Sequence, residues 1–350
     1  MMPKYQHVFV SALGYELGPV VVTTAQLEER LAPAFTRLGI QPGQLEAWTG
    51  IHERRWWEPG TPLSQGATAA ARKALAKSGL AADDLGALLY CGVCRENFEP
   101  ATACAVADGI GLRGGAFVYD LSNACLGVLN GMIEVANRIE LGQIRAGLVV
   151  SCESAREINE IALARMLGGT GGMDEFAPAL ATFTGGSGAV ALLLTDGSFP
   201  GLQGHRLVGA VSEVAPEFHQ LCRWGIKPNA DGLHEQFMTT DSVAVLKNGV
   251  VLGQKTWAEF LGAMNWPAAS VDKVICHQVG SGHQDAILKS IGVPRDKDYT
   301  TFRFLGNMGT AALPVTAAIA DERGVLKPAQ RVAFLGIGSG LTCLMMGLEW

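Results

Sequence analysis

The chain has 350 residues and a mass of 36.9 kDa, with 48% hydrophobic and only 17% charged residues. Soluble proteins usually carry about 25% charged residues, so this composition predicts a large packed core and excludes a mainly disordered chain. The formal net charge is −6 and there is no run of basic residues, which argues against a nucleic-acid partner. No apolar run reaches the roughly 18 residues that a membrane span needs, and Met1–Ser11 lacks the apolar core of a secretion signal. We therefore expect a cytoplasmic protein whose cysteines are reduced.

Two stretches of the chain repeat one order of predicted elements, namely strand, helix, strand or loop, helix, strand. The first strand of each copy ends at Cys91 or Cys276, and the second helix of each copy follows Cys125 or Asn307. The spacings agree, with 34 residues from Cys91 to Cys125 and 31 from Cys276 to Asn307. Short aliphatic runs that alternate with helical periodicity predict an α/β fold with mostly parallel or mixed sheets.

We divide the chain into two homologous halves, residues 1–204 and 205–350. The first half carries an insertion at about 155–182, with a predicted helix over Glu157–Met166 and a glycine-rich linker at Gly168–Gly172. We interpret this insertion as a lid or dimer element that can line or gate a binding site.

Cys125 lies at a predicted strand-to-helix junction, in Leu121–Gly127. The positive end of a helix lowers the pKa of a thiol and favours the nucleophilic thiolate. Backbone N–H groups at the same place can hold an oxyanion. The simpler alternative is a cysteine of the core.

His277 and Asn307 are the candidates in the second copy. His277 follows an aliphatic run, which places it at the carboxyl end of a parallel strand, where α/β sheets hold their sites. Asn307 occupies the position that matches Cys125, so a pseudo-twofold axis would bring both to one pocket. Read alone, His277 could be a structural hydrogen-bonding residue and Asn307 a turn residue.

Glu99 precedes Pro100, a residue suited to the first position of a helix, so the local pattern predicts a helix-capping glutamate. A helix N-terminus lowers the pKa of a carboxyl group and weakens it as a base, unless burial raises the pKa again.

We expect neither metal nor cofactor. Cys91 and Cys94 have the spacing of half a zinc site, but no second pair of matching spacing follows. His277 and His283 are poorly spaced as a ligand pair, and Gly336–Gly340 only loosely resembles a dinucleotide loop, because no helix follows it.

Together these motifs resemble the thiolase superfamily and, within it, the ketosynthase III-like condensing enzymes. The motifs, in chain order, are Thr49–Arg55 (TGI-x-x-R), Asn123–Gly127 (the nucleophile turn), His277–Gln278 (HQ), Gly306–Asn307 (GN) and Gly338–Thr342 (the closing glycine loop). The resemblance implies a thiolase-like fold, with two homologous halves in a layered α-β-α-β-α arrangement.

A closer resemblance is to the OleA-type thiolases of long-chain olefin biosynthesis, which condense two acyl-CoA molecules. The segments that carry it are Phe98–Pro100, Leu221–Arg223, Gln254–Thr256, His277–Val279 with His283, and Leu335–Leu341. In that family a glutamate 26 residues before the nucleophile, here Glu99, reaches into the partner subunit's active site as the base. The resemblance therefore implies a homodimer with Cys125, His277, Asn307 and Glu99 as catalytic residues. It also implies an oxyanion hole made by the backbone N–H groups of Cys125 and Ser339.

The resemblance implies an acyltransferase that joins two fatty acyl thioesters by non-decarboxylative Claisen condensation through a cysteine acyl-enzyme. Such a reaction has no CO2 to lose, so a base must remove an α-proton. Fatty acyl-CoA or an acyl carrier protein would deliver the substrates, and downstream pathway enzymes are possible partners.

Three alternatives remain open at this point. A decarboxylative β-ketoacyl synthase III would use a malonyl donor, and Glu99 would only cap a helix. An ester-forming acyltransferase or a non-catalytic partner subunit would share the fold. Gln44–Trp48 lacks the arginine of the W-I-x-x-R segment of the fatty-acid initiation enzymes, which leaves the CoA-binding surface unassigned.

Overall fold

The computed structural model describes residues 4–229 and 231–350. Nine strands form one mixed sheet: β1 (Phe9–Leu17), β4 (Ala87–Cys91), β5 (Phe117–Leu121), β6 (Ala146–Glu153), β7 (Gly188–Thr195), β8 (His205–Val214), β11 (Lys273–Cys276), β12 (Arg331–Gly338) and β13 (Thr342–Glu349). Their order across the sheet is β11-β12-β13-β8-β1-β7-β6-β4-β5.

The sheet consists of two blocks with the same pattern of pairing. In the first block β4 is parallel to β5 and β6, and β7 is antiparallel to β6 and β1. In the second block β11 is parallel to β12, and β13 is antiparallel to β12 and β8. The counterpart of β5 is reduced to a single parallel bridge between Val274 and Asp298. This pattern agrees with the repeat in the sequence, and the boundary after residue 204 stays a prediction.

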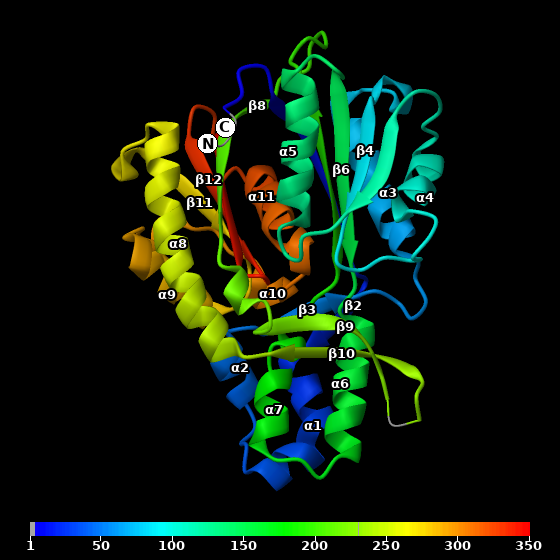
Figure 1. Cartoon of the computed structure of the whole chain (residues 1–350), viewed down its shortest axis with the longest axis vertical. Helices are drawn as coiled ribbons and strands as arrows, with labels where there is room; N and C mark the ends of the chain where they lie inside the picture. The colour runs from blue at the N-terminus through cyan, green and yellow to red at the C-terminus, as the bar shows by residue number, and fades with distance from the viewer. Residues whose placement is uncertain (1–3, 230) are drawn as a thin grey trace.

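Helices form three layers around these blocks (Figure 1). The central pair is α5 (Gly127–Glu140) and α11 (Ala312–Glu322), the outer pair on the first block is α3 (Leu63–Ser78) and α4 (Thr102–Ile110), and the outer pair on the second block is α8 (Ser242–Met264) and α9 (Ser281–Ile291). Side chains of α5 and α11 share one core with strands of both blocks, while each outer pair packs in a core of its own. The layered α-β-α-β-α arrangement is thus confirmed.

Sequence pattern explains the central layer. Helix α5 has an apolar stripe that is buried at Leu129, Met132, Ala136 and Ile139. In α11 every residue from Ala312 to Ala320 is buried, as expected of a helix that is apolar on all sides and packs in the middle of a protein.

A smaller lobe lies in the lower part of Figure 1. It contains β2 (Val20–Thr23), α1 (Thr24–Leu38), α2 (Gln44–Thr49), β3 (Glu53–Trp56), α6 (Arg156–Gly168) and α7 (Met173–Ala179). The helix predicted in the insertion is α6, and it shares an apolar cluster with α1 and α7. Trp48 belongs to the segment that lacks the arginine of the W-I-x-x-R motif. Its ring packs on Phe176 of this lobe, with ring centroids 6.2 Å apart.

A hairpin of β9 (Cys222–Pro228) and β10 (His234–Thr240) lies between this lobe and the sheet, and the short helix α10 (Phe302–Leu305) precedes Asn307. The sequence pattern did not predict the hairpin. Within the described ranges, none of the helices has both the length and the apolarity that crossing a bilayer requires.

Candidate active site

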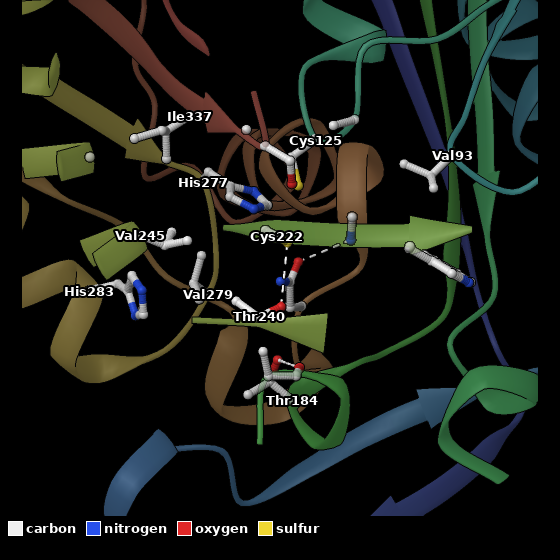
Figure 2. A pocket seen from close by; sticks show the side chains of 18 of the residues that line it. Val93, Cys125, Thr184, Cys222, Thr240, Val245, His277, Val279, His283 and Ile337 are labelled. Carbon is white, nitrogen blue, oxygen red and sulfur yellow. Dashed lines mark hydrogen bonds between the residues drawn. The ribbon is translucent and has the colours of Figure 1, made fainter. Parts of the chain in front are cut away.

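A cavity of about 670 Å³ lies between the second block of the sheet, α8 and the hairpin β9–β10. Cys125, His277, Asn307 and Ser339 all line it, so the fold brings together four residues that the sequence singled out. Figure 2 shows the Cys125 side chain and the His277 ring close together, with Cys222 on the hairpin strand across the cavity.

Cys125 lies just before α5, which begins at Gly127. Ala124 has a φ of 45°, in the left-handed region, and this turns the chain so that the thiol enters the cavity. The prediction of a lowered pKa is wrong: burial, reinforced by Cys222 and Glu153, raises the pKa of the Cys125 thiol to about 12. Loss of hydration disfavours the thiolate in this apolar setting, so Cys125 is a neutral thiol in the resting protein.

The closing glycine loop lies directly against the nucleophile. A Cβ placed on Gly338 would be 3.3 Å from the backbone nitrogen of Cys125, so a glycine lets the two backbones approach closely. Ser339, the next residue, lines the cavity. The oxyanion hole formed by its N–H group and that of Cys125 stays a prediction.

His277 follows β11, and its backbone N–H donates to the Leu335 carbonyl at 2.9 Å, which continues the parallel ladder. Burial, together with His283, lowers the pKa of His277 to about 4, so the imidazole is neutral at pH 7. Its Nδ1 is buried and has no hydrogen-bond partner among the described residues. A neutral imidazole beside a neutral thiol can accept the thiol proton as the sulfur attacks.

Backbone contacts fix Asn307 in place. Its N–H donates to the Thr184 carbonyl and its carbonyl accepts from Gly186 N–H, both at 2.9 Å. The side-chain Oδ1 accepts from Gly309 N–H at 3.0 Å, which leaves the Nδ2 amide as the donor that the side chain offers to a ligand.

Glu99 lies apart from these residues, at an exposed position of the loop 92–101, and it is not among the described residues that line the cavity. The interpretation of Glu99 as a helix cap is wrong. Helix α4 begins at Thr102, and the Asp120 carboxylate accepts from the N–H groups of Thr102 (2.9 Å) and Ala103 (2.8 Å). Asp120 lies at the end of β5. The free backbone N–H groups at the start of α4 are therefore bound by a residue that is distant in sequence, and not by Glu99.

Comparisons with known proteins agree with this geometry. A family model described as 3-oxoacyl-[acyl-carrier-protein (ACP)] synthase III C terminal matches residues 261–350. An acyl-CoA:acyl-CoA alkyltransferase of Shewanella oneidensis is 52% identical over 99% of this chain and 100% of its own length. A Xanthomonas campestris enzyme of the same name is 35% identical and covers 99% of both chains. This chain belongs to the acyl-CoA:acyl-CoA alkyltransferase family.

Solved structures extend the likeness to three dimensions. Xanthomonas campestris OleA with bound lauric acid and lauroyl-CoA is 35% identical, with a TM-score of 0.92, and the match covers 99% of this chain and 100% of that one. A variant of that enzyme with one glutamate replaced matches with a TM-score of 0.93 over 100% of this chain and 98% of its own. The predicted thiolase-like fold, the OleA-type resemblance and the classification as an acyltransferase are therefore confirmed.

The fold also places residues in the cavity that the motifs did not select. Glu153 ends β6, is 3% exposed and lines the cavity. The signal that could have found it is the one used for His277, a polar residue at the carboxyl end of a strand with parallel neighbours. His283 lines the cavity farther from Cys125 (Figure 2). No group of three or more potential metal ligands occurs among the residues that the structure describes.

Proposed function

We propose that this protein joins two fatty acyl-CoA molecules by non-decarboxylative Claisen condensation and releases a β-keto product. The observation that carries the proposal is the meeting of Cys125, His277 and Asn307 at one end of an apolar cavity, in a member of this family. Many of the other residues that line this cavity are apolar, including Val245, Val250, Ile287, Leu335, Ile337, Leu341 and Met345. Such a surface suits an acyl chain.

Cys125 takes the first acyl group. As the sulfur attacks the thioester carbonyl, its proton passes to neutral His277, and the backbone N–H groups of Cys125 and Ser339 hold the oxyanion. The bond to the CoA sulfur breaks, His277 returns the proton to that sulfur, and CoA leaves. The cavity then holds an acyl-enzyme.

The second acyl-CoA is activated as a carbanion. His277 and the Asn307 amide donate hydrogen bonds to its thioester oxygen, where the negative charge of the enolate develops. A carboxylate removes the α-proton, and the α-carbon bonds to the acyl carbon held by Cys125. The carbon–sulfur bond to Cys125 breaks and a β-ketoacyl-CoA is released, while the α-proton taken by the carboxylate restores the Cys125 thiol.

We assign the base to Glu99 of the partner subunit. In one chain Glu99 is exposed and lies outside the cavity, and Phe98 beside it is 94% exposed, as expected of a loop that inserts into a second copy. In solved variants of Xanthomonas campestris OleA, a glutamate and a cysteine 26 positions apart have each been replaced, and Glu99 and Cys125 have the same separation.

We place the reaction in the cytoplasm, because the eight cysteines are free thiols, which a reducing compartment preserves.

The first test supplies myristoyl-CoA alone, without malonyl-CoA. We expect CoA release together with a β-keto acid or the ketone formed from it by loss of CO2. Acylation of Cys125 without a coupled product, restored by malonyl-CoA, would instead identify a decarboxylative synthase.

Mixed dimers test the placement of Glu99. Cys125→Ala and Glu99→Gln proteins, each inactive in condensation, are unfolded together in equal amounts and refolded. If the base comes from the partner, half of the dimers regain one complete site, and about one quarter of wild-type activity returns. If Glu99 acts within its own chain, no subunit is ever complete and activity stays absent. Refolded wild-type protein gives the reference.

A further inference from the structure

We infer that Glu153 is a positioning residue for the condensation step, because its carboxylate joins the loop that carries Glu99 to the turn that carries Asn307. The inference rests on the proposed function. It assigns a role to a buried acid that the reaction scheme does not otherwise use.

One side of the Glu153 carboxylate holds the beginning of the loop 92–101. Its Oε1 accepts from Val93 N–H at 2.9 Å and its Oε2 accepts from Cys94 N–H at 3.1 Å. The thiol of Cys94 also donates to the carbonyl of Ser154, the next residue along, at 3.4 Å. The path of the chain toward Glu99 is therefore set at its origin by the end of β6.

The other side of the carboxylate faces the turn after Asn307. A Cβ placed on Gly309 would lie 3.3 Å from the Glu153 carboxyl carbon, so the backbone of this turn lies against the acid. The backbone N–H of Thr310 also favours the charged form of the carboxylate and lowers its pKa against the effect of burial. Because Gly309 N–H holds the Asn307 side chain, any shift of this turn moves the donor for the enolate.

Thr310 extends the connection to the nucleophile. Its hydroxyl oxygen accepts from Val128 N–H at 2.8 Å, in the first turn of α5, which follows Cys125. The Asn307 turn, which lies against the buried acid, is thus also bound to the segment that follows Cys125.

The geometry favours positioning over proton transfer by Glu153 itself. Both carboxylate oxygens already accept from backbone N–H groups, and these hydrogen bonds lower the pKa of Glu153 and weaken it as a base. A buried carboxylate is costly unless such donors surround it, so these contacts both stabilise the charge and fix the segments that provide them.

Glu153→Gln tests the inference because it keeps the size of the side chain and replaces one acceptor by an NH2 donor. That NH2 would face a backbone N–H, so one contact to the loop or the turn is lost. A displacement of about 1 Å can cost about 100-fold in rate. With myristoyl-CoA we expect the stoichiometric CoA release of Cys125 acylation within about twofold of wild type and β-keto product lowered about 10- to 100-fold.

Glu28→Gln is the matched control. Glu28 is 8% exposed, accepts from Gly43 N–H (2.6 Å) and Leu45 N–H (2.8 Å), and lies in the small lobe away from the cavity. It reports the general cost of replacing a buried acid that binds two amides. Its ratio of condensation to acylation should equal that of wild type.

An unchanged ratio in Glu153→Gln, or equal losses of acylation and condensation, would overturn the inference. If the Glu153→Gln protein does not fold, Glu153→Asp is the second test. This variant keeps the charge and draws the carboxylate back by one methylene, so it should also lower the ratio of condensation to acylation. Absence of β-keto product from wild type would refute the proposed function instead, and the two failures are thereby distinguished.

Discussion

Strands β4 and β11 are equivalent in the two halves of the molecule, but the loops that follow them differ in length and direction. After β4 the loop 92–101 is ten residues long, and it exposes Glu99 on the surface. After β11 only residues 277–280 intervene before α9, and His277 faces the cavity of its own chain. One frame thus provides a short inward loop for a resident catalytic group and a long outward loop for a group that we assign to the neighbouring site.

The turns that lead to Cys125 and Asn307 are also equivalent in the two halves. They differ in the side chain that they present and resemble each other in a positive backbone φ. The residue before Cys125, Ala124, has a φ of 45°, and the residue before Asn307, Gly306, has a φ of 66°. Both turns therefore have a positive φ at the residue before the side chain that enters the cavity. In the function that we propose, one turn presents the nucleophile Cys125 and the other the hydrogen-bond donor Asn307.

The outer helices differ in how closely they cover the sheet. Helix α3 packs on the first block through alanines that are fully buried, including Ala67, Ala70, Ala71 and Ala74. Helix α8 lies over the second block with Gly249 and Gly253 on the cavity, so the space for substrate is on this side.

The largest expected effect separates the two turns. Cys125→Ala should abolish both CoA release and product formation, a loss on the order of 10⁴-fold or more, because the covalent step is lost. Asn307→Ala should retain acylation and lower condensation by about 100- to 1,000-fold, as for loss of one oxyanion donor. Single-turnover CoA release and product analysis check both. Equal loss of acylation in the two variants would contradict the division of roles.

The second effect concerns pH. With the pKa of Cys125 near 12, the thiolate fraction is small at neutral pH and rises with pH. Alkylation of Cys125 by iodoacetamide should accelerate about tenfold per pH unit from about pH 6 to 9, without a plateau. Mass spectrometry of the Cys125 peptide measures the rate, with Cys125→Ala as the blank for other cysteines. A plateau in this range would show a thiolate stabilised by the helix end.

A smaller effect tests the difference between the outer helices. On Gly249 a Cβ would lie 2.9 Å from Ile337 Cδ1, so Gly249→Leu should fill part of the cavity. Each methylene that no longer fits costs about 0.8 kcal/mol, or roughly fourfold in kcat/KM, and longer acyl-CoA substrates should lose most. Gly262→Leu is the control, since a Cβ at this position of α8 meets no atom within 4 Å. The same chain-length profile in both variants would place the acyl chain elsewhere.

The smallest effect compares the residues before the two catalytic positions. Ala124→Gly should stabilise the protein by about 1 kcal/mol, because glycine adopts the left-handed region without strain. Gly306→Ala should destabilise it by about 1–3 kcal/mol, since its Cβ would also lie 2.5 Å from the Thr184 carbonyl oxygen. Denaturant unfolding measures both. Changes of the same sign would show that the turns are not equivalent.

Local patterns in the sequence were sufficient to predict the frame and part of the site. Strand and helix periods gave the repeated α/β order, and the rule that sites lie at the carboxyl ends of strands selected His277. Matching the two copies then predicted that Cys125 and Asn307 converge, and both line one cavity. These inferences succeeded because periodicity and spacing are properties of neighbouring residues.

Only the tertiary structure decided the properties that depend on distant residues. Burial by other elements reversed the expected pKa shift of Cys125, and Asp120 replaced Glu99 as the cap of α4. The hairpin β9–β10 over the cavity and the contacts of Glu153 likewise arise from segments far apart in the chain. Desolvation and hydrogen-bond partners depend on what the fold places around a group, and a local pattern cannot specify them.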